Sequence, residues 1–245
     1  MMKRIPEYCH FLIAAAFIAT AAVAGCGTAG INRVGDAADF SHQETAFMTG
    51  TGKNLSAGTV SFWHGSDGEN LAFAPVEGGD VVAVYDAEKG GEIRRLGSAG
   101  TDKGQLDGPV DTVVADNLLF VLERGNRRIQ VFHLPEMESF GFFGDDRLND
   151  PSHIALYRIE HGAFYIYVAD IVESGGGQTA GILRFSASRA VNTFHTAYQK
   201  TFGYTENGGY LGTVRSIEID PEQKRLLVDD GNVRRYSIDG DAVGR

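Results

Sequence analysis

The fold is decided by the stretch from Gly97 to Gly144, GSAGTDKGQLDGPVDTVVADNLLFVLERGNRRIQVFHLPEMESFGFFG. It contains four short apolar or alternating runs, each bounded by glycine, proline or other turn residues. The runs are Thr112–Ala115, Leu118–Leu122, Ile129–Phe132 and Phe140–Phe143. Short runs separated by turn residues indicate antiparallel strands. The stretch therefore predicts one four-stranded sheet with the layout of a propeller blade.

The same order of runs recurs three more times along the chain. The repeats cover residues 58–96, 151–203 and 213–243, and each passes from an apolar run through a turn to a second apolar run and an alternating run. The repeat at 151–203 has a longer tip, Ile171–Ala180. Because a single blade cannot bury both of its faces, an all-β repeat of about forty to sixty residues predicts blades packed around an axis.

We therefore expect an all-β fold, a β-propeller with four visible blades. Four is at the low end for a closed propeller. Either the ring is unusually small, or the chain holds the first two-thirds of a larger, six-bladed ring. Helical periodicity is weak and is confined to Ser186–Tyr198.

The N-terminal residues have the layout of a secretory signal. Lys3 and Arg4 precede an apolar run, Phe11–Val23, that is too short to span a membrane comfortably. The run Val23-Ala-Gly-Cys26 resembles a bacterial lipobox. This resemblance implies that a signal peptide, residues 1–25, is removed and that Cys26 then carries a lipid anchor. The alternative is an ordinary signal peptide with a chance cysteine.

The residues after the lipobox indicate a location and a spacer. Gly27 stands where an aspartate would favour retention in the inner membrane. We therefore expect a lipid-anchored protein of the bacterial cell envelope, in the outer membrane and facing the periplasm or the exterior. Residues 26–54 are expected to form a spacer ahead of the propeller at residues 55–245. Within them, Glu44–Thr49 is either part of the spacer or a strand of another blade.

Charge and cysteine content exclude some partners and cross-links. The formal charge is −10, and loss of the signal with Lys3, Arg4 and Glu7 makes it more negative. An acidic protein repels nucleic acid and anionic lipid, so we expect no nucleic-acid partner and membrane contact only through the lipid. Of the two cysteines, Cys9 lies in the removed segment, so no internal disulfide is expected.

Two resemblances follow from these motifs. The stretch from Gly97 to Gly144 resembles an NHL-type blade, with Gly104-Gln-Leu, Pro109 and Asn126-Arg-Arg-Ile-Gln-Val-Phe. All four repeats together resemble the β-propeller phytase-like family, secreted six-bladed proteins whose active members hydrolyse inositol phosphates with calcium. The second resemblance rests on Ser61-Phe-Trp, Val84-Tyr-Asp, Val121-Leu-Glu-Arg, Tyr165-Ile-Tyr-Val-Ala-Asp and Ser216-Ile-Glu-Ile-Asp-Pro.

The phytase-like resemblance implies roles for three residues. Arg124 matches a catalytic, phosphate-contacting arginine, and Asp230 and Asp170 match acidic positions that would be calcium ligands. The residues also allow plainer alternatives. Arg124 would then be an exposed turn residue paired with Glu123, and Asp230 would belong to the tight bend Asp229-Asp-Gly-Asn.

Other positions depart from the family pattern. Thr59 and Arg215 stand where the family has acidic residues, and Gly231 stands where a further acidic residue is expected. Pro75–Glu77 contains no cation where the family has a lysine. Calcium needs about six to eight oxygen ligands, so these losses weaken the implied site. The sequence therefore indicates a phytase-type scaffold with an eroded site.

Two functions remain open. One is a phosphomonoesterase of the 3-phytase type that acts on an organic phosphate, such as an inositol phosphate, through Arg124 with calcium at Asp230. The other is a non-catalytic NHL-type propeller that serves as a binding scaffold for a protein or glycan partner. Other motifs add little: the histidines after the signal show no metal-ligand spacing, and arginine pairs such as Arg127–Arg128 are expected on solvated outer faces.

Overall fold

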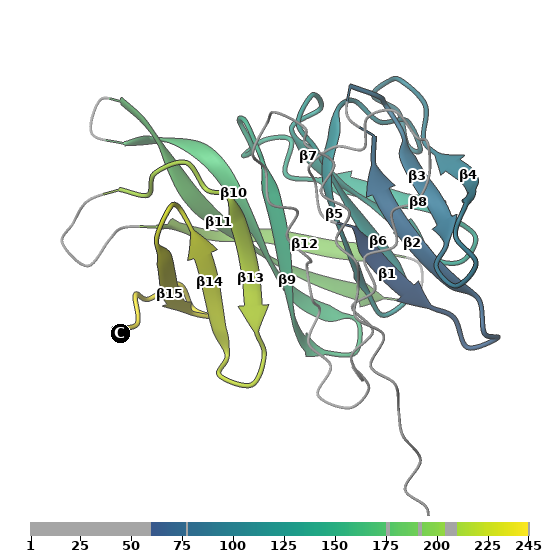
Figure 1. Ribbon diagram of the computed structural model, residues 1–245. Helices are drawn as coiled ribbons and strands as arrows, with labels where there is room; N and C mark the ends of the chain where they lie inside the picture. The colour runs from purple at the N-terminus through teal and green to yellow at the C-terminus, as the bar shows by residue number, and fades with distance from the viewer. Residues whose placement is uncertain (1–59, 77, 175–176, 191–192, 204–209, 245) are drawn as a thin grey trace, which may run out of the picture.

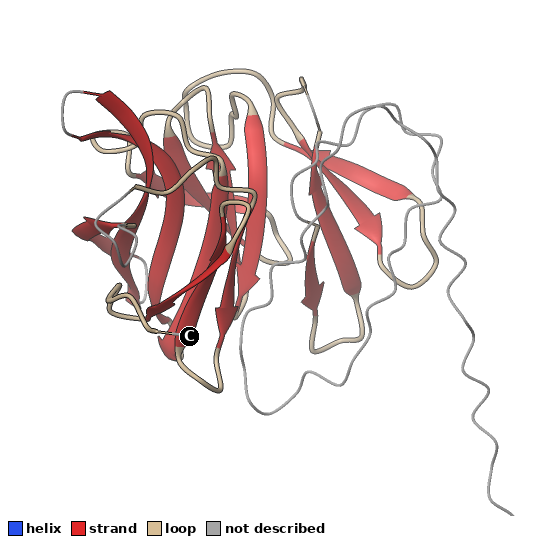
Figure 2. Ribbon diagram, turned by 60° about the vertical axis from the view of Figure 1, so that its left-hand side comes forward, coloured by secondary structure: helices blue, strands red, loops and turns tan. Residues whose placement is uncertain are grey.

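The computed structural model describes residues 60–244, apart from residues 77, 175–176, 191–192 and 204–209. Every regular secondary-structure element in this part of the chain is a β-strand, as Figure 2 shows. The same residues contain no helix with the length and hydropathy of a membrane span. The expected signal peptide, lipidated Cys26, the spacer and Glu44–Thr49 lie outside the described residues.

The strands form four antiparallel sheets in chain order (Figure 1). Blade 1 holds β1 (Ser61–His64), β2 (Asn70–Pro75), β3 (Val82–Asp86) and β4 (Glu92–Leu96). Blade 2 holds β5 (Pro109–Ala115), β6 (Leu118–Glu123), β7 (Arg128–His133) and β8 (Glu138–Phe143). Blade 3 holds β9 (His153–Glu160), β10 (Ala163–Ser174), β11 (Gly177–Ala190) and β12 (Thr193–Phe202). Blade 4 holds β13 (Ser216–Asp220), β14 (Arg225–Asp229) and β15 (Val233–Ser237). This architecture confirms the prediction of an all-β propeller with four blades.

Neighbouring blades meet along their first strands. Strand β5 contacts β1 and β2, strand β9 contacts β5, and strand β13 contacts β9. Figure 1 shows the blades following one another from blue blade 1 on the right to yellow blade 4 on the left. Blades that are adjacent in sequence are therefore adjacent in space, as expected of a repeat in which each unit packs on the next.

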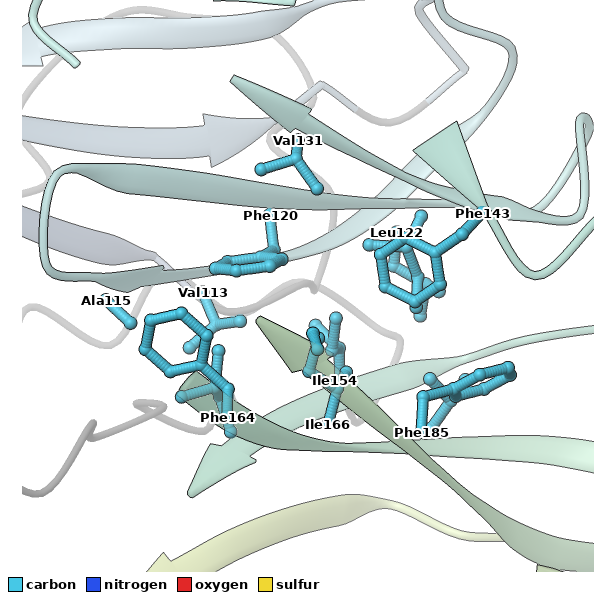
Figure 3. Packing of buried hydrophobic residues seen from close by; sticks show 14 of the residues in the cluster. Val113, Ala115, Phe120, Leu122, Val131, Phe143, Ile154, Phe164, Ile166 and Phe185 are labelled. Atoms are coloured by element: carbon cyan, nitrogen blue, oxygen red, sulfur yellow. The ribbon is translucent and has the colours of Figure 1, made fainter. Parts of the chain in front are cut away.

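Blade 2 buries both of its faces because side chains alternate along its strands. In β6, Phe120 and Leu122 belong to the apolar core shared with blade 3. Leu119 and Val121 point the other way and belong to the core shared with blade 1. Figure 3 shows the core between blades 2 and 3, where Phe120 meets Phe164 edge to face with ring centroids 5.7 Å apart. Such a pair contributes about 0.5–1.5 kcal/mol beyond the area it buries.

The arginine at the start of β7 faces inward. Arg128 is 3% exposed, and its Nε lies 2.8 Å from Oε1 of Glu123, the last residue of β6. Its guanidinium also donates to the carbonyl oxygens of Thr101 (2.5 Å) and Gln105 (3.0 Å). The prediction that Arg128 lies on a solvated outer face is wrong, because this side chain fastens the glycine-rich segment before β5 to the sheet.

One end of each blade brings together segments that are distant in sequence. Because the strands are antiparallel and in chain order, the first strand starts at the same end at which the second strand finishes. We call this the leading end. In blades 2, 3 and 4 it comprises the segments that lead into β5, β9 and β13, together with the ends of β6, β10 and β14.

Candidate functional site

All three residues with roles implied by the sequence lie at the leading end. Arg124 directly follows β6, and Asp230 directly follows β14. Asp170 lies in β10, one residue beyond the pairing of Ala169 with His153 at the start of β9. The three residues belong to blades 2, 4 and 3, respectively. Arg124 and Asp170 both contact the segment that leads into β9, and Asp230 contacts the segment that leads into β13.

Arg124 reaches from blade 2 to the segment that leads into blade 3. Its Nε lies 3.1 Å from Oδ1 of Asp150 and donates to the carbonyl oxygen of Pro151 at 3.2 Å. The side chains of this ion pair are 52% exposed for Arg124 and 59% exposed for Asp150. The alternative that Arg124 pairs with Glu123 is wrong, because Glu123 is paired with Arg128.

His153, the first residue of β9, lies next to Arg124. The histidine is half-buried, and its Nδ1 lies 3.1 Å from Oγ of Ser152. Burial lowers the pKa of His153 below its usual value, and the positive charge of Arg124 lowers it further. A hydrogen bond to the backbone of Arg215 acts in the opposite direction. At neutral pH the ring is therefore held mainly in its neutral form.

Arg215, next to the first strand of blade 4, approaches His153 through its backbone. It lies in the segment that leads into β13, and its backbone N–H donates to the carbonyl oxygen of Asp229 at 2.7 Å. The side chain is exposed, and its Nη2 would lie 3.7 Å from a Cβ placed on Gly231. The position that departs from the family pattern by reversing charge thus adjoins His153 and Arg124. We call Arg124, His153 and Arg215 the cationic cluster, after its two arginines.

The carboxylate oxygens of Asp170 accept hydrogen bonds from backbone N–H groups. Its Oδ2 accepts from the N–H of Asn149 at 2.8 Å, and its Oδ1 accepts from the N–H groups of Asp150 (2.6 Å) and Ile171 (2.7 Å). Burial raises the pKa of Asp170 above its usual value, although the three N–H groups oppose the rise. The carboxyl group holds the segment before β9 against the end of the sheet.

The carboxylate oxygens of Asp230 also accept hydrogen bonds from the protein. Its Oδ2 accepts from Arg234 Nε at 2.8 Å and from the N–H of Gly212 at 3.0 Å, and its Oδ1 accepts from the N–H of Asn232 at 3.3 Å. Burial alone would raise the pKa of Asp230, but the hydrogen bonds and the charge of Arg234 outweigh it and the pKa is lowered. The carboxylate thus joins the segment before β13 to blade 4.

Blade 2 contains the same contact. Oε2 of Glu123 accepts from the N–H of Asp107 at 3.0 Å. In blades 2, 3 and 4, a carboxyl group at the point where pairing between the first and second strands ends, or one residue beyond it, therefore accepts an N–H from the segment that leads into the first strand. We call Glu123, Asp170 and Asp230 the clamp carboxylates.

The clamp carboxylates do not fit the calcium site that the family resemblance implies. Both oxygens of Asp170 and both oxygens of Asp230 already accept hydrogen bonds from the protein. Among the residues that the structure describes, no group of three or more His, Cys, Asp or Glu side chains is placed to hold a metal ion. Calcium therefore stays a prediction from the sequence, which the positions of these carboxylates do not support.

The sequence identified Arg124 as a candidate ligand contact and Arg215 only as a charge reversal in the implied metal site, and it did not identify His153. No pattern along the chain distinguishes His153, because its partners come from blades 2 and 4. The sequence does carry one signal for these residues, which is their position in the repeat: His153 and Arg215 stand where an apolar run begins in the third and fourth repeats. Aligning the repeats by these starts would have placed both residues at the leading end.

Comparisons with known proteins support the fold. No protein-family model matches the sequence, and no curated protein matches it either. Two similar solved structures are provisionally described as 6-phosphogluconolactonases, from Bacteroides uniformis ATCC 8492 (15% identity, TM-score 0.51) and Bacteroides fragilis NCTC 9343 (14% identity, TM-score 0.50). They cover 78% and 76% of this chain. The chain spans 57% and 53% of their lengths, so at these identities the likeness shows a shared propeller fold.

Proposed function

We propose that this protein is a non-hydrolytic propeller that binds an organic phosphate at the cationic cluster of Arg124, His153 and Arg215. The observation that carries the proposal is that His153 of blade 3 lies beside the charge of Arg124 from blade 2 and beside the backbone of Arg215, whose exposed side chain lies near Gly231 of blade 4. In a chain with a formal charge of −10, such a local excess of cations favours an anionic ligand against the overall field.

The donors present suit a phosphate group. A guanidinium offers a planar fork of N–H donors that matches two phosphate oxygens, and two such groups can share one highly charged ligand. The ion pair between Arg124 and Asp150 is exposed, so it contributes at most about 1 kcal/mol and a phosphate can replace the carboxylate at little cost.

Binding is favoured over hydrolysis because of the clamp carboxylates. Attack on a phosphomonoester requires an activated water, which a metal ion commonly supplies. Asp170 and Asp230, the implied metal ligands, accept hydrogen bonds on both oxygens from the groups that hold the leading segments. We therefore assign them a structural role and assign ligand contact to the cationic cluster.

Two resemblances guide the choice of ligand. The phytase-like motifs imply inositol phosphates, and the similar solved propellers are provisionally described as enzymes of a phosphorylated sugar lactone. Phosphate on a small polar ring is the chemistry that these descriptions share. Inositol hexakisphosphate is the first probe, and glucose 6-phosphate tests whether a single phosphate is enough.

Isothermal titration calorimetry of inositol hexakisphosphate tests the proposal. We expect saturable binding that is the same in calcium and in a chelator, and a loss of about tenfold or more in affinity for Arg124→Ala and for Arg215→Ala. Arg95→Ala is the matched control, because Arg95 is an exposed arginine of β4 paired with Glu92 at 2.7 Å. An equal loss in the control would show non-specific attraction and contradict the proposed site. Calcium-dependent release of phosphate from the same probe would contradict a non-hydrolytic role.

The proposal places this binding in the bacterial cell envelope. The support is the N-terminal sequence, in which the lipobox-like run ends at Cys26. Mass spectrometry of the mature N-terminus in a bacterial host tests it: a diacylglyceryl group on Cys26 is expected, and Cys26→Ser should release the protein from the membrane fraction. An unmodified mature N-terminus would contradict the lipid anchor and leave the binding site unaffected.

A further inference from the structure

His153 is surrounded by hydrogen-bond acceptors. The hydroxyl of Ser152 donates to the carbonyl oxygen of Ala169 at 3.3 Å, so toward Nδ1 of His153 it acts as an acceptor at 3.1 Å. The ring also forms a hydrogen bond with the backbone of Arg215. A neutral imidazole has one N–H to donate, whereas an imidazolium has two. The hydrogen-bond geometry at His153 therefore suits the protonated ring.

The charge of Arg124, which approaches from the turn after β6, opposes that protonation. Arg215 approaches from the segment before β13 through its backbone, and this contact favours the protonated ring. Of the carboxyl groups nearby, Asp150 is paired with Arg124 at 3.1 Å. Asp111 of β5 is fully buried and accepts from the N–H of Ile154 at 2.9 Å.

Asp170, on β10, accepts hydrogen bonds from three backbone N–H groups. The hydrogen bonds of His153 favour the protonated ring, whereas its burial and the charge of Arg124 keep the ring neutral.

We propose that an anion bound between Arg124 and Arg215 draws a proton from solvent onto His153, so that ligand and proton bind together. The inference rests on the proposed function and adds its regulation. A polyanion would offset the charge of Arg124, which helps to keep the ring neutral, and the imidazolium would supply a further cationic donor to the ligand. Linkage then requires the affinity for the anion to rise as pH falls between the pKa of His153 in the complex and its lower pKa in the free protein.

The test uses inositol hexasulfate, whose sulfate esters stay fully ionised across the pH range where histidine titrates. Any proton taken up on binding therefore comes onto the protein. Calorimetry in buffers of different ionisation enthalpy should show uptake of up to about one proton per ligand, and affinity should rise by up to about tenfold per pH unit within the window. The His153 ring signals in NMR should titrate at higher pH in the complex than in the free protein.

Two histidine variants make the test specific. His153→Gln should still bind inositol hexasulfate at high pH but should lose both the proton uptake and the rise in affinity at low pH. His161→Gln is the matched control, because His161 is 86% exposed and contacts Asp116, away from the cluster. This control should keep the proton uptake of the wild type. Thermal unfolding of both variants verifies that they are folded.

The outcomes separate this inference from the proposed function. Saturable binding that depends on Arg124 and Arg215 but takes up no proton would overturn the inference and leave the proposed function standing. Proton uptake that persists in His153→Gln would also overturn the inference. An absence of saturable inositol hexasulfate binding at every pH would overturn both.

Discussion

Blades 2 and 4 use the same clamp in different surroundings. In blade 2, the clamp carboxylate Glu123 has no exposed side-chain surface and pairs with Arg128, which is 4% exposed. In blade 4, the side chain of Asp230 is 2% exposed, but that of its partner Arg234 is 29% exposed, so solvent reaches the ion pair from the arginine. Both arginines come from the third strand of their own blade, and both ion pairs measure 2.8 Å.

The comparison teaches that an acidic residue at the end of the second strand is a fastening element of the blade. The blades differ in how far water can reach the ion pair that this acidic residue forms. A buried charge left unpaired is costly because water cannot reach it, whereas a charge near the surface is readily solvated. The contribution of each clamp to stability should therefore follow its burial, from Glu123 through Asp170 to Asp230.

The largest effect is expected for Glu123→Ala. The change would leave the guanidinium of Arg128 buried without its counter-charge and would remove acceptors from Asn126 and Gln130. We expect the free energy of unfolding to fall by about 3–5 kcal/mol, measured by chemical denaturation.

The matched control for this variant is Glu138→Ala, which removes an exposed glutamate of β8 in the same blade and should change stability by less than about 0.5 kcal/mol. The double variant Glu123→Leu with Arg128→Met should recover much of the loss, because neither charge then remains unpaired. A loss for Glu123→Ala as small as that for Glu138→Ala would break the comparison between the blades.

An intermediate effect is expected for Asp170→Asn. The amide keeps the shape of the side chain. However, its NH₂ group is a hydrogen-bond donor, and it would face a backbone N–H that donates to a carboxylate oxygen in the wild type. We expect a loss of about 1–3 kcal/mol in the free energy of unfolding. Asp146→Asn, in the exposed segment between β8 and β9, is the control and should be close to neutral. A neutral Asp170→Asn would show that the backbone N–H groups find other acceptors.

The sequence predicted the blades well because apolar alternation and turn residues are local properties. The runs Leu118–Leu122 and Ile129–Phe132 lie within β6 and β7. The direction in which Arg128 points could not be predicted in the same way. A strand has two faces, and the choice between them for Arg128 depends on Glu123 and on the glycine-rich segment that folds back over the sheet.

The sequence predicted where the candidate site lies but not which residues make it up. Arg124, Asp170 and Asp230 were identified because they match positions of the phytase-like family, and all three lie at the leading end. Their partners, and the cluster that includes His153 and Arg215, depend on how successive blades pack. Contacts between blades join residues dozens of positions apart, and no local pattern records them.

A smaller effect, with a defined pH dependence, is expected for Asp230→Asn. The pKa of Asp230 is held below its usual value, so its contribution to stability is present above the ordinary pKa of an aspartate and is lost as pH falls through the lowered value. We expect a difference of about 1 kcal/mol from wild type at pH 7, which shrinks toward zero in acid. Asp241→Asn, an exposed residue of the last turn, should show no such pH dependence. A difference that grows in acid would contradict the clamp assignment.

The smallest effect is expected for calcium itself. If Asp170 and Asp230 are clamps in blades 3 and 4, as Glu123 is in blade 2, an ion would compete there with the hydrogen bonds that every one of these oxygens accepts. About 5 mM calcium should then shift the midpoint of thermal unfolding by less than about 1 °C. Magnesium at the same concentration controls for ionic strength. A tightly bound calcium ion would instead stabilise the folded state by RT ln(1 + [Ca²⁺]/Kd), which reaches about 2.7 kcal/mol at a hundredfold excess over Kd. A calcium-specific rise that Asp230→Asn abolishes would show that this clamp opens to bind the ion, and blades 2 and 4 would then differ in function as well as in burial.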